Sequence, residues 1–276
     1  MFQQRVPRRP LDGAIESVWV FSAPPGPFAL ERILPTGRAQ LIVNLKEDRL
    51  RAYDTAPPYR RTTGPGTVLA GVSSRHAIID TAETEHVAGV TFAPGGVSHL
   101  FDVPADETRD VDVPLADLWG RAQTMALRER LLESRTPAAA LDVLEDVLLA
   151  HWRPESLHKA VVYALDVFQR VPHLARIDAV TTTVGLSPKR FIDRFTREVG
   201  VTPKRFCRLR RFQRVTTRIH QGQQVDWAQL ALECGYADQA HFNHEFREFS
   251  GLTPRRYLAQ CGPFQNHVKI LQSPTG

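Results

Sequence analysis

Two short segments in the last third of the chain carry side chains that can bind nucleic acid. The first segment contains Lys189, Arg190, Asp193, Arg194 and Arg197, and the second contains Gln239, His241, Asn243, His244 and Arg247. Lysine and arginine neutralise phosphates, and glutamine or asparagine can form paired hydrogen bonds with an adenine edge. This combination of side chains predicts contacts with both the backbone and the bases of double-stranded DNA.

In the first segment, Lys189 and Asp193 are four residues apart, so a helix would direct both toward one edge of a groove. We expect Arg190 and Arg197 to contact phosphates. The sequence leaves two interpretations of Asp193 open. It accepts a hydrogen bond from a cytosine amino group, or it pairs with a neighbouring lysine or arginine.

In the second segment, Gln239 and Asn243 lie one helical turn apart, and we expect them to read bases. The alternative is an ordinary polar face in contact with solvent. His241 can equally be a packing residue or a contact to the DNA backbone. Replacement of Gln239 or Asn243 is therefore expected to alter sequence preference.

Both segments lie within two copies of one sequence pattern. Six residues recur 51 positions later: Phe191, Phe195, Gly200, Thr202, Pro203 and Phe206 return as Phe242, Phe246, Gly251, Thr253, Pro254 and Tyr257. A repeat this dense implies one small structural unit that is used twice.

Each copy predicts a helix-turn-helix. In the first copy, a short amphipathic helix at residues 177–184 precedes Gly185, which can adopt the positive φ of a tight turn. Ser187 can cap a second helix, and Gly200 ends it. The second copy has the same features at residues 227–234, Gly235, Asp238 and Gly251. Two ordinary helical hairpins are the alternative.

The second copy resembles the signature of the AraC family of bacterial transcription regulators. The residues that carry the resemblance are Gly-Tyr-Ala-Asp-Gln-Ala-His-Phe at 235–242, followed by Phe246, Gly251, Thr253, Pro254 and Tyr257. The resemblance covers residues 172–262. It implies two helix-turn-helix units, each of which lays its second helix into the DNA major groove. It also implies RNA polymerase as a partner.

The stretch between the copies predicts a long connecting helix. Its apolar row is Phe206, Leu209, Phe212, Val215 and Ile219. The rest of its surface is basic, with Lys204, Arg205, Arg208, Arg211, Arg214 and Arg218. These cations either contact phosphate or lie on a solvated face, and the sequence does not decide between the two.

The distribution of charge supports a nucleic-acid partner. Residues 172–262 contain 15 Lys and Arg against 8 Asp and Glu, a balance of +7, whereas the whole chain carries +5. The three cysteines, Cys207, Cys234 and Cys261, lack the spacing of a zinc site. No apolar run suits a secretory signal or a membrane span. We therefore expect a cytoplasmic protein without membrane contact.

Residues 14–103 predict a β-rich domain. Short apolar or β-branched runs at residues 17–21, 40–45, 66–71, 76–80 and 86–92 are separated by proline and glycine. Such strands suit a sandwich or a small barrel, and the resemblance implies a cupin-like barrel. A barrel interior formed by Trp19, Phe21, Leu41, Val43, Val90 and Phe92 could hold a small effector or be packed.

The fold class that we expect is α+β, divided into four parts. These are a β-rich sensor or dimerisation domain at 1–103, a helical dimerisation or linker segment at 104–171, the all-α double helix-turn-helix at 172–262 and a C-terminal tail at 263–276. Leu141, Leu144 and Leu148 form an apolar helix face. We expect part of this face to make the protein a homodimer.

Two alternative functions are a cupin-type metalloenzyme and an Ada-like repair protein. The metal-capable residues of the N-terminal region are His76, Glu83, Glu85, His86 and His99, and their spacing does not match a cupin metal site. An Ada-like protein needs a cysteine cluster near its N-terminus, but Cys207 is the first cysteine. We therefore expect a sequence-specific DNA-binding regulator that is not an enzyme and needs no cofactor.

Overall fold

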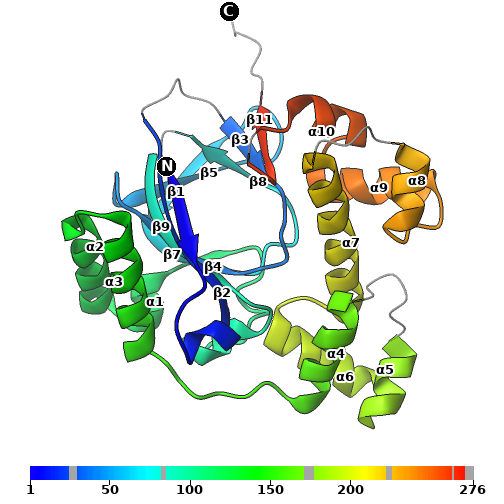
Figure 1. Ribbon diagram of the computed structural model, residues 1–276, viewed down its shortest axis with the longest axis horizontal. Coiled ribbons are helices and arrows are strands. Elements are labelled where there is room, and N and C mark those ends of the chain that lie inside the picture. The colour runs from blue at the N-terminus through cyan, green and yellow to red at the C-terminus, as the bar shows by residue number, and fades with distance from the viewer. Residues whose placement is uncertain (25–29, 82–84, 171–176, 222–225, 263, 271–276) are drawn as a thin grey trace, which may run out of the picture.

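The computed structural model describes residues 1–24, 30–81, 85–170, 177–221, 226–262 and 264–270. The β-rich part of the molecule is built from two antiparallel sheets that curve around a common axis (Figure 1). The larger sheet has the strand order β1 (Phe2–Arg5), β2 (Ile15–Ser22), β9 (His86–Phe92), β4 (Gln40–Asn44), β7 (Thr67–Ala70) and β10 (Asp112–Pro114). The smaller sheet has the order β11 (His267–Ile270), β3 (Leu30–Ile33), β8 (Ala77–Asp80), β5 (Arg49–Tyr53) and β6 (Arg61–Pro65).

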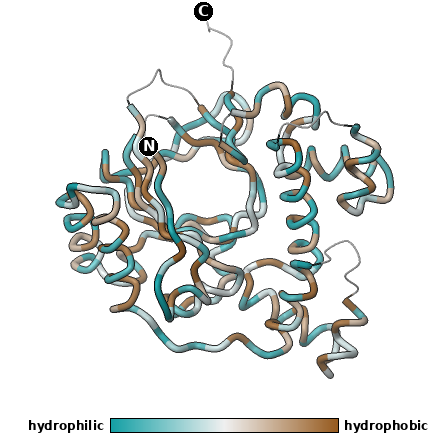
Figure 2. Tube along the Cα trace, in the orientation of Figure 1, coloured by the Kyte–Doolittle hydropathy of each residue, from teal (hydrophilic) through white to brown (hydrophobic). Residues whose placement is uncertain are grey.

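The predicted fold class is confirmed. The five predicted runs correspond to β2, β4, β7, β8 and β9, and a helical domain follows the β-rich part. Short 3-10 helices, η1 (Leu11–Gly13) and η3 (Gly96–His99), adjoin the larger sheet. Figure 2 shows apolar residues along the strands and on the helices beside them.

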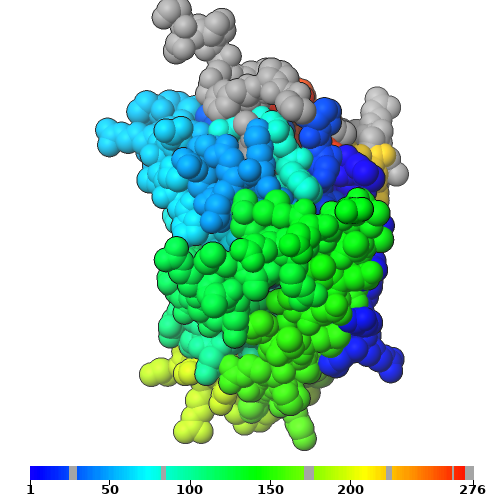
Figure 3. Space-filling model, turned by 90° about the vertical axis from the view of Figure 1, so that its left-hand side faces the viewer, coloured from blue at the N-terminus to red at the C-terminus, as the bar shows by residue number. Residues whose placement is uncertain are grey.

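One face of the larger sheet is covered by helices. In the strand register, Val18 and Leu41 both lie opposite Val90, so their side chains share a face. This face packs against α3 (Pro137–Ala150) and α2 (Arg121–Glu133), which follow the short α1 (Leu115–Trp119). Figure 3 shows these helices as a continuous green layer over the strands.

The predicted lining of the barrel interior is wrong for four residues. Leu41, Val43, Val90 and Phe92 belong to the core under the helices, at most 1% exposed. Trp19 lies opposite Gly89 and therefore on the other face of the sheet, as does Phe21. The indole N–H of Trp19 donates to Oγ1 of Thr91 at 3.2 Å. The alternation of side chains along each strand separates the two groups.

The apolar face of α3 is also not a free surface. Leu141, Leu144 and Leu148 are each 1% exposed and pack within the same core as the strand residues of the larger sheet. An amphipathic helix buries its apolar face against whatever layer lies beside it, and here that layer is the sheet of the same chain. The interpretation of these leucines as a dimer surface is therefore wrong.

The helical domain stands beside the two sheets along its central helix, α7 (Pro203–His220) (Figure 1). α4 (Lys159–Arg170), α5 (Ile177–Val184) and α6 (Pro188–Val199) gather at one end of α7, and α8 (Trp227–Glu233), α9 (Gln239–Ser250) and α10 (Pro254–Gln260) at the other. α4 lies within the segment predicted as a linker, but it packs on α6, where the rings of Phe168 and Phe195 are 5.7 Å apart.

The C-terminal strand joins the two parts of the molecule. β11 lies within the segment predicted as a tail and pairs antiparallel with β3 of the smaller sheet. Val268 of β11 and Leu34, just after β3, belong to one buried cluster with Leu209 of α7 and Tyr257 of α10. The core around the second helix-turn-helix is therefore shared with the β-rich domain.

Replacement of Leu144 by alanine is expected to lower the free energy of unfolding by about 2–5 kcal/mol, because it opens a cavity between α3 and the larger sheet. Sedimentation should give the same mass for this variant and the unchanged protein. Leu132→Ala is the control, since Leu132 is 46% exposed on α2 and its truncation should cost less than about 0.5 kcal/mol. If Leu144→Ala changed the association state but not the free energy of unfolding, Leu144 would lie in an interface between chains and not in the core.

Candidate nucleic-acid interface

The first unit has the geometry of a helix-turn-helix. α5 ends at a turn in which Gly185 has φ +68°, and α6 then begins. The side chain of Ser187 caps α6 by accepting a hydrogen bond from the backbone N–H of Arg190 at 3.4 Å. Gly200 ends the helix in the left-handed conformation, with φ 88°.

The second unit repeats these features. Gly235 has φ 83° between α8 and α9, and Gly251 ends α9 with φ 68°. Oδ1 of Asp238 accepts from the backbone N–H of His241 at 2.7 Å. The prediction of two matched helix-turn-helix units, including their caps and terminal glycines, is confirmed.

The candidate residues of the first unit lie on the solvent face of α6. Lys189, Arg190, Asp193, Arg194 and Arg197 are all exposed. Phe191, Phe195 and Val199 point the other way and are at most 1% exposed. Nη1 of Arg194 lies 3.5 Å from Oε1 of Glu198, one turn along the helix.

Asp193 makes no ion pair within 4.0 Å in the part of the chain that the structure describes. The interpretation in which it pairs with a neighbouring cation therefore receives no support. Its carboxylate is exposed on the same helix face as Lys189. Both side chains are available to a ligand that approaches α6 from solvent.

On α9, four of the five candidate residues are exposed: Gln239, Asn243, His244 and Arg247. His241 differs from them. Its Nε2 lies 3.8 Å from Oε2 of the buried Glu245, and its ring meets that of Tyr236 edge-on at 5.4 Å between centroids. Of the two interpretations of His241, this geometry favours packing.

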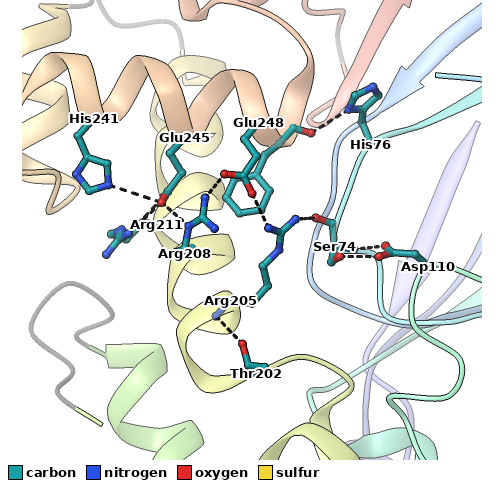
Figure 4. Close-up of polar contacts among 11 residues, drawn as sticks. Ser74, His76, Asp110, Thr202, Arg205, Arg208, Arg211, His241, Glu245 and Glu248 are labelled. Atoms are coloured by element: carbon teal, nitrogen blue, oxygen red, sulfur yellow. Dashed lines mark hydrogen bonds and ion pairs between the residues drawn. The ribbon is translucent and has the colours of Figure 1, made fainter. Parts of the chain in front are cut away.

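A buried ion network lies behind α9, and the sequence analysis missed it. The carboxylate of Glu245 is only 2% exposed and accepts from Nε of Arg208 at 2.7 Å and from Nη2 of Arg211 at 3.2 Å (Figure 4). Glu248 accepts from Nη1 of Arg205 at 2.6 Å and also from Arg208. Arg205, Arg208 and Arg211 therefore hold α9 against α7, which is neither of the two roles that were expected.

The spacing of these residues is the signal that could have revealed the network. The arginines recur every third position on α7, and Glu245 and Glu248 are also three apart on α9. Side chains three apart lie on one face of a helix, so the two faces can meet. The guanidinium of Arg205 also lies over the ring of Phe249, 4.6 Å from its centroid.

The network continues into the β-rich domain. Nη2 of Arg205 donates to the carbonyl oxygen of Ser74 at 2.7 Å, and Ser74 is held by the carboxylate of Asp110 through two hydrogen bonds of 2.6 Å (Figure 4). Nδ1 of His76 lies 3.2 Å from the carbonyl oxygen of Phe249, near the end of α9. Burial, together with the charge of Arg32, lowers the pKa of His76.

The residues proposed as possible metal ligands are dispersed. His76 contacts α9, Glu85 pairs with Lys46 at 2.6 Å, and the ring of His99 stacks on Trp152. Glu83 lies outside the described residues. Across those residues, no group of three or more histidine, cysteine or acidic side chains is arranged to hold a metal.

In the part of the chain that the structure describes, no helix is long and apolar enough to cross a membrane.

Glu245→Gln is expected to lower the free energy of unfolding by about 1.5–3 kcal/mol, because Arg208 and Arg211 lose the charge that they surround. The control is Glu233→Gln. Glu233 pairs with Arg218 at 2.5 Å, but it is 41% exposed, so its loss should cost less than about 1 kcal/mol. Chemical denaturation measures both, and equal losses would contradict the buried role of Glu245.

The free energy of unfolding should also depend on pH through the carboxylate of Glu248. Burial acts to raise its pKa, but hydrogen bonds and charges from Arg208 and Arg205 outweigh it and hold the pKa below the ordinary 4.5. The stabilisation is therefore present above pH 4.5 and is lost as the pH falls through the folded-state value. Unfolding free energy should fall less steeply with acidification in Glu248→Gln. Identical slopes would mean that the ion pairs do not form in solution.

Comparison with known families supports this geometry. A family model described as a helix-turn-helix domain matches residues 180–260, which span α6 to α10. A second model, described as a domain of unknown function (DUF6597), matches residues 3–114. No curated protein matches the chain.

Solved structures of bacterial regulators are similar to the chain at low identity. ToxT from Vibrio cholerae is 12% identical, with 94% of this chain and 98% of that chain covered at a TM-score of 0.46. The C-terminal domain of the response regulator AraT from Geobacillus stearothermophilus is 18% identical, with 38% of this chain and 88% of that chain covered at a TM-score of 0.36.

A regulator from Chromobacterium violaceum, described as AraC-type, is 22% identical and covers 37% of this chain and 95% of its own at a TM-score of 0.33. The family match and the two capped units together indicate a DNA-binding function. The chain is a DNA-binding transcription regulator whose helix-turn-helix domain, at residues 180–260, is of the AraC type.

Proposed function

We propose that the chain reads two adjacent major-groove segments of one operator, with α6 in one groove and α9 in the next. The observation that carries this proposal is the pair of matched, capped units whose solvent faces hold basic and amide side chains. The long helix α7 separates the two units. Two helices that read one face of a duplex must lie about one helical turn apart, roughly 34 Å.

On α9, Gln239 and Asn243 read bases, since both amides are exposed one turn apart near the start of the helix. Arg247 and His244 lie on the same exposed surface and contact the backbone. His241 acts through its contact with Glu245 and positions the helix.

On α6, Lys189 and Asp193 face one edge of the groove, with Asp193 as the acceptor for a cytosine amino group. Arg190, Arg194 and Arg197 grip phosphates on either side. This division of roles follows the exposure of the side chains and the absence of an ion pair at Asp193 among the described residues.

The β-rich domain controls the DNA-binding units in this proposal. Ser74 and His76 contact Arg205 and the end of α9, so a small effector bound to this domain can influence the second reading helix. Trp19 and Phe21, on the sheet face away from α3, are the partly exposed aromatic residues placed to meet such a ligand.

We further propose that the protein forms a dimer through its N-terminal region and contacts RNA polymerase. The leucine face of α3 is buried within one chain and is not part of this dimer interface.

We place the protein in the cytoplasm. Burial raises the pKa of the Cys207 thiol to about 11, and the thiol of Cys234 is also buried with a raised pKa. Both are inert small residues of a core, which suits a reducing compartment.

The two kinds of contact can be separated with the full chain on its operator. Gln239→Ala should cost about 1–3 kcal/mol on the preferred sequence and relax preference at one base position. Arg197→Ala should weaken binding to all sequences about equally and reduce the log–log salt slope by about 1. Fluorescence anisotropy across a salt series measures both.

Arg61→Ala is the matched control, because Arg61 is exposed on β6, at the opposite edge of the smaller sheet from β11. Its affinity and salt slope should equal those of the unchanged protein. Uniform loss on every sequence for Gln239→Ala would show that Gln239 reads no base. Unchanged binding in Arg197→Ala would remove the C-terminal half of α6 from the interface.

A further inference from the structure

A basic pocket of about 640 Å³ lies where α7 meets the β-rich domain and α8. Its charged lining residues are Arg38, from the segment before β4, Arg210, Arg214 and Arg218 of α7, and Glu233 of α8. Nε2 of Gln213, another lining residue on α7, donates to the carbonyl oxygen of Pro35 at 2.8 Å. The pocket therefore spans the boundary between the two domains.

Two of its cations have no acidic partner. Arg38 pairs with Glu16, and Arg218 pairs with Glu233 at 2.5 Å. Arg210 and Arg214, in contrast, have no carboxylate within 4.0 Å among the described residues. Among these residues, Arg214 makes one hydrogen bond: its Nη2 donates to the carbonyl oxygen of Arg170 at 2.7 Å.

Arg210 and Arg214 are each only partly exposed, and the charges of Arg38 and Arg214 act on Arg210. Burial, followed by these neighbouring cations, lowers the pKa of Arg210, whereas the carboxylate of Glu16, which pairs with Arg38, acts in the opposite direction. Like charges brought together in a half-buried position destabilise the protein unless an anion joins them. The unpaired guanidinium groups thus favour a negatively charged ligand over a purely structural role.

The pocket is separate from the DNA-reading surface. Arg208 binds the glutamates of α9. Arg210 follows two positions later on α7, which is about 200° around the helix axis, so the two side chains lie on nearly opposite faces of the helix. A cation on the face of α7 turned away from α9 is not placed to contact the groove that α9 would enter. Arg210 therefore faces away from the groove that α9 would enter.

We propose that this pocket binds a small molecule with two or more negative charges, either a phosphorylated compound or a di- or tricarboxylate. Its anionic groups lie between Arg38, Arg210 and Arg214. The planar guanidinium group binds carboxylate and phosphate oxygens in a bidentate manner. Because Arg38 belongs to one domain and Arg210 to the other, the anion stabilises the docked arrangement of the two.

The test uses the full chain and two probes, inorganic pyrophosphate and citrate, each titrated at constant ionic strength maintained with sodium chloride. Calorimetry and thermal melting should show saturable binding and a raised Tm for at least one probe. Arg210→Gln should weaken that binding about tenfold or more, since each charged hydrogen bond contributes strongly to affinity. Binding of pyrophosphate alone, citrate alone or both identifies the class of ligand.

Two controls distinguish this site from other basic surfaces. Arg61→Gln on β6 and Arg190→Gln on α6 should bind the probe as tightly as the unchanged protein. Without a probe, Arg210→Gln should melt at the same temperature or higher, because it relieves repulsion among the cations. This readout separates a ligand site from a structural arginine, and Arg214→Gln provides a second variant should Arg210→Gln fail to fold.

The proposal is overturned if neither probe binds saturably, or if binding persists in both Arg210→Gln and Arg214→Gln. It is also overturned if Arg190→Gln alone abolishes binding, since the anion would then occupy the reading surface. DNA affinity in the absence of the probe should be unchanged in Arg210→Gln. Failure of the anion site therefore leaves the proposed DNA-binding function intact.

Discussion

The carboxylate of Glu245 lies almost completely buried between the guanidinium groups of Arg208 and Arg211, and the position of α9 on α7 depends on it. A buried carboxylate is unfavourable unless cations and hydrogen bonds surround it. Once surrounded, it allows only the arrangement that keeps those partners. The network therefore adds directional contacts between α9 and α7 to the phenylalanine core, whose apolar contacts are not directional.

The same network extends to the β-rich domain through Arg205, which binds both Glu248 and the carbonyl oxygen of Ser74. β11 adds a second connection, since it follows α10 and pairs with β3. Val268 and Leu34 then complete the apolar core around α10. A change in the β-rich domain can consequently reach the second unit through packed and hydrogen-bonded contacts. The first unit meets that domain at the end of α6, where the backbone N–H of Ala105 donates to the carbonyl oxygen of Arg197 at 2.9 Å.

The helix-turn-helix units could be predicted from the sequence because their signals are local. The caps, the turn glycines and the phenylalanine spacing lie within about twenty residues of one another, and each has a direct conformational meaning. The assignment of individual contacts to DNA remains a prediction, because exposure makes Gln239 and Lys189 available without showing what they bind.

Features that depend on contacts between distant segments could not be predicted from the sequence. The pattern of Leu141, Leu144 and Leu148 indicated a buried face but not which layer covers it. The faces of Trp19 and Leu41 depend on the register between β2, β9 and β4, which no single strand reveals. β11 pairs with a strand near the other end of the chain. The spacing of the α7 arginines indicates a shared helix face, but it does not identify the glutamates of α9, 34 to 43 positions later, that this face meets.

The most direct test of the central claim is selection of duplexes that bind the full chain from a random pool. The two-unit arrangement predicts enriched sites with two preferred blocks centred about one helical turn apart, roughly 34 Å along the duplex. Replacement of Gln239 should change preference in one block and leave the other intact. Enrichment of a single block, or no enrichment above the starting pool, would contradict the reading of DNA by both α6 and α9.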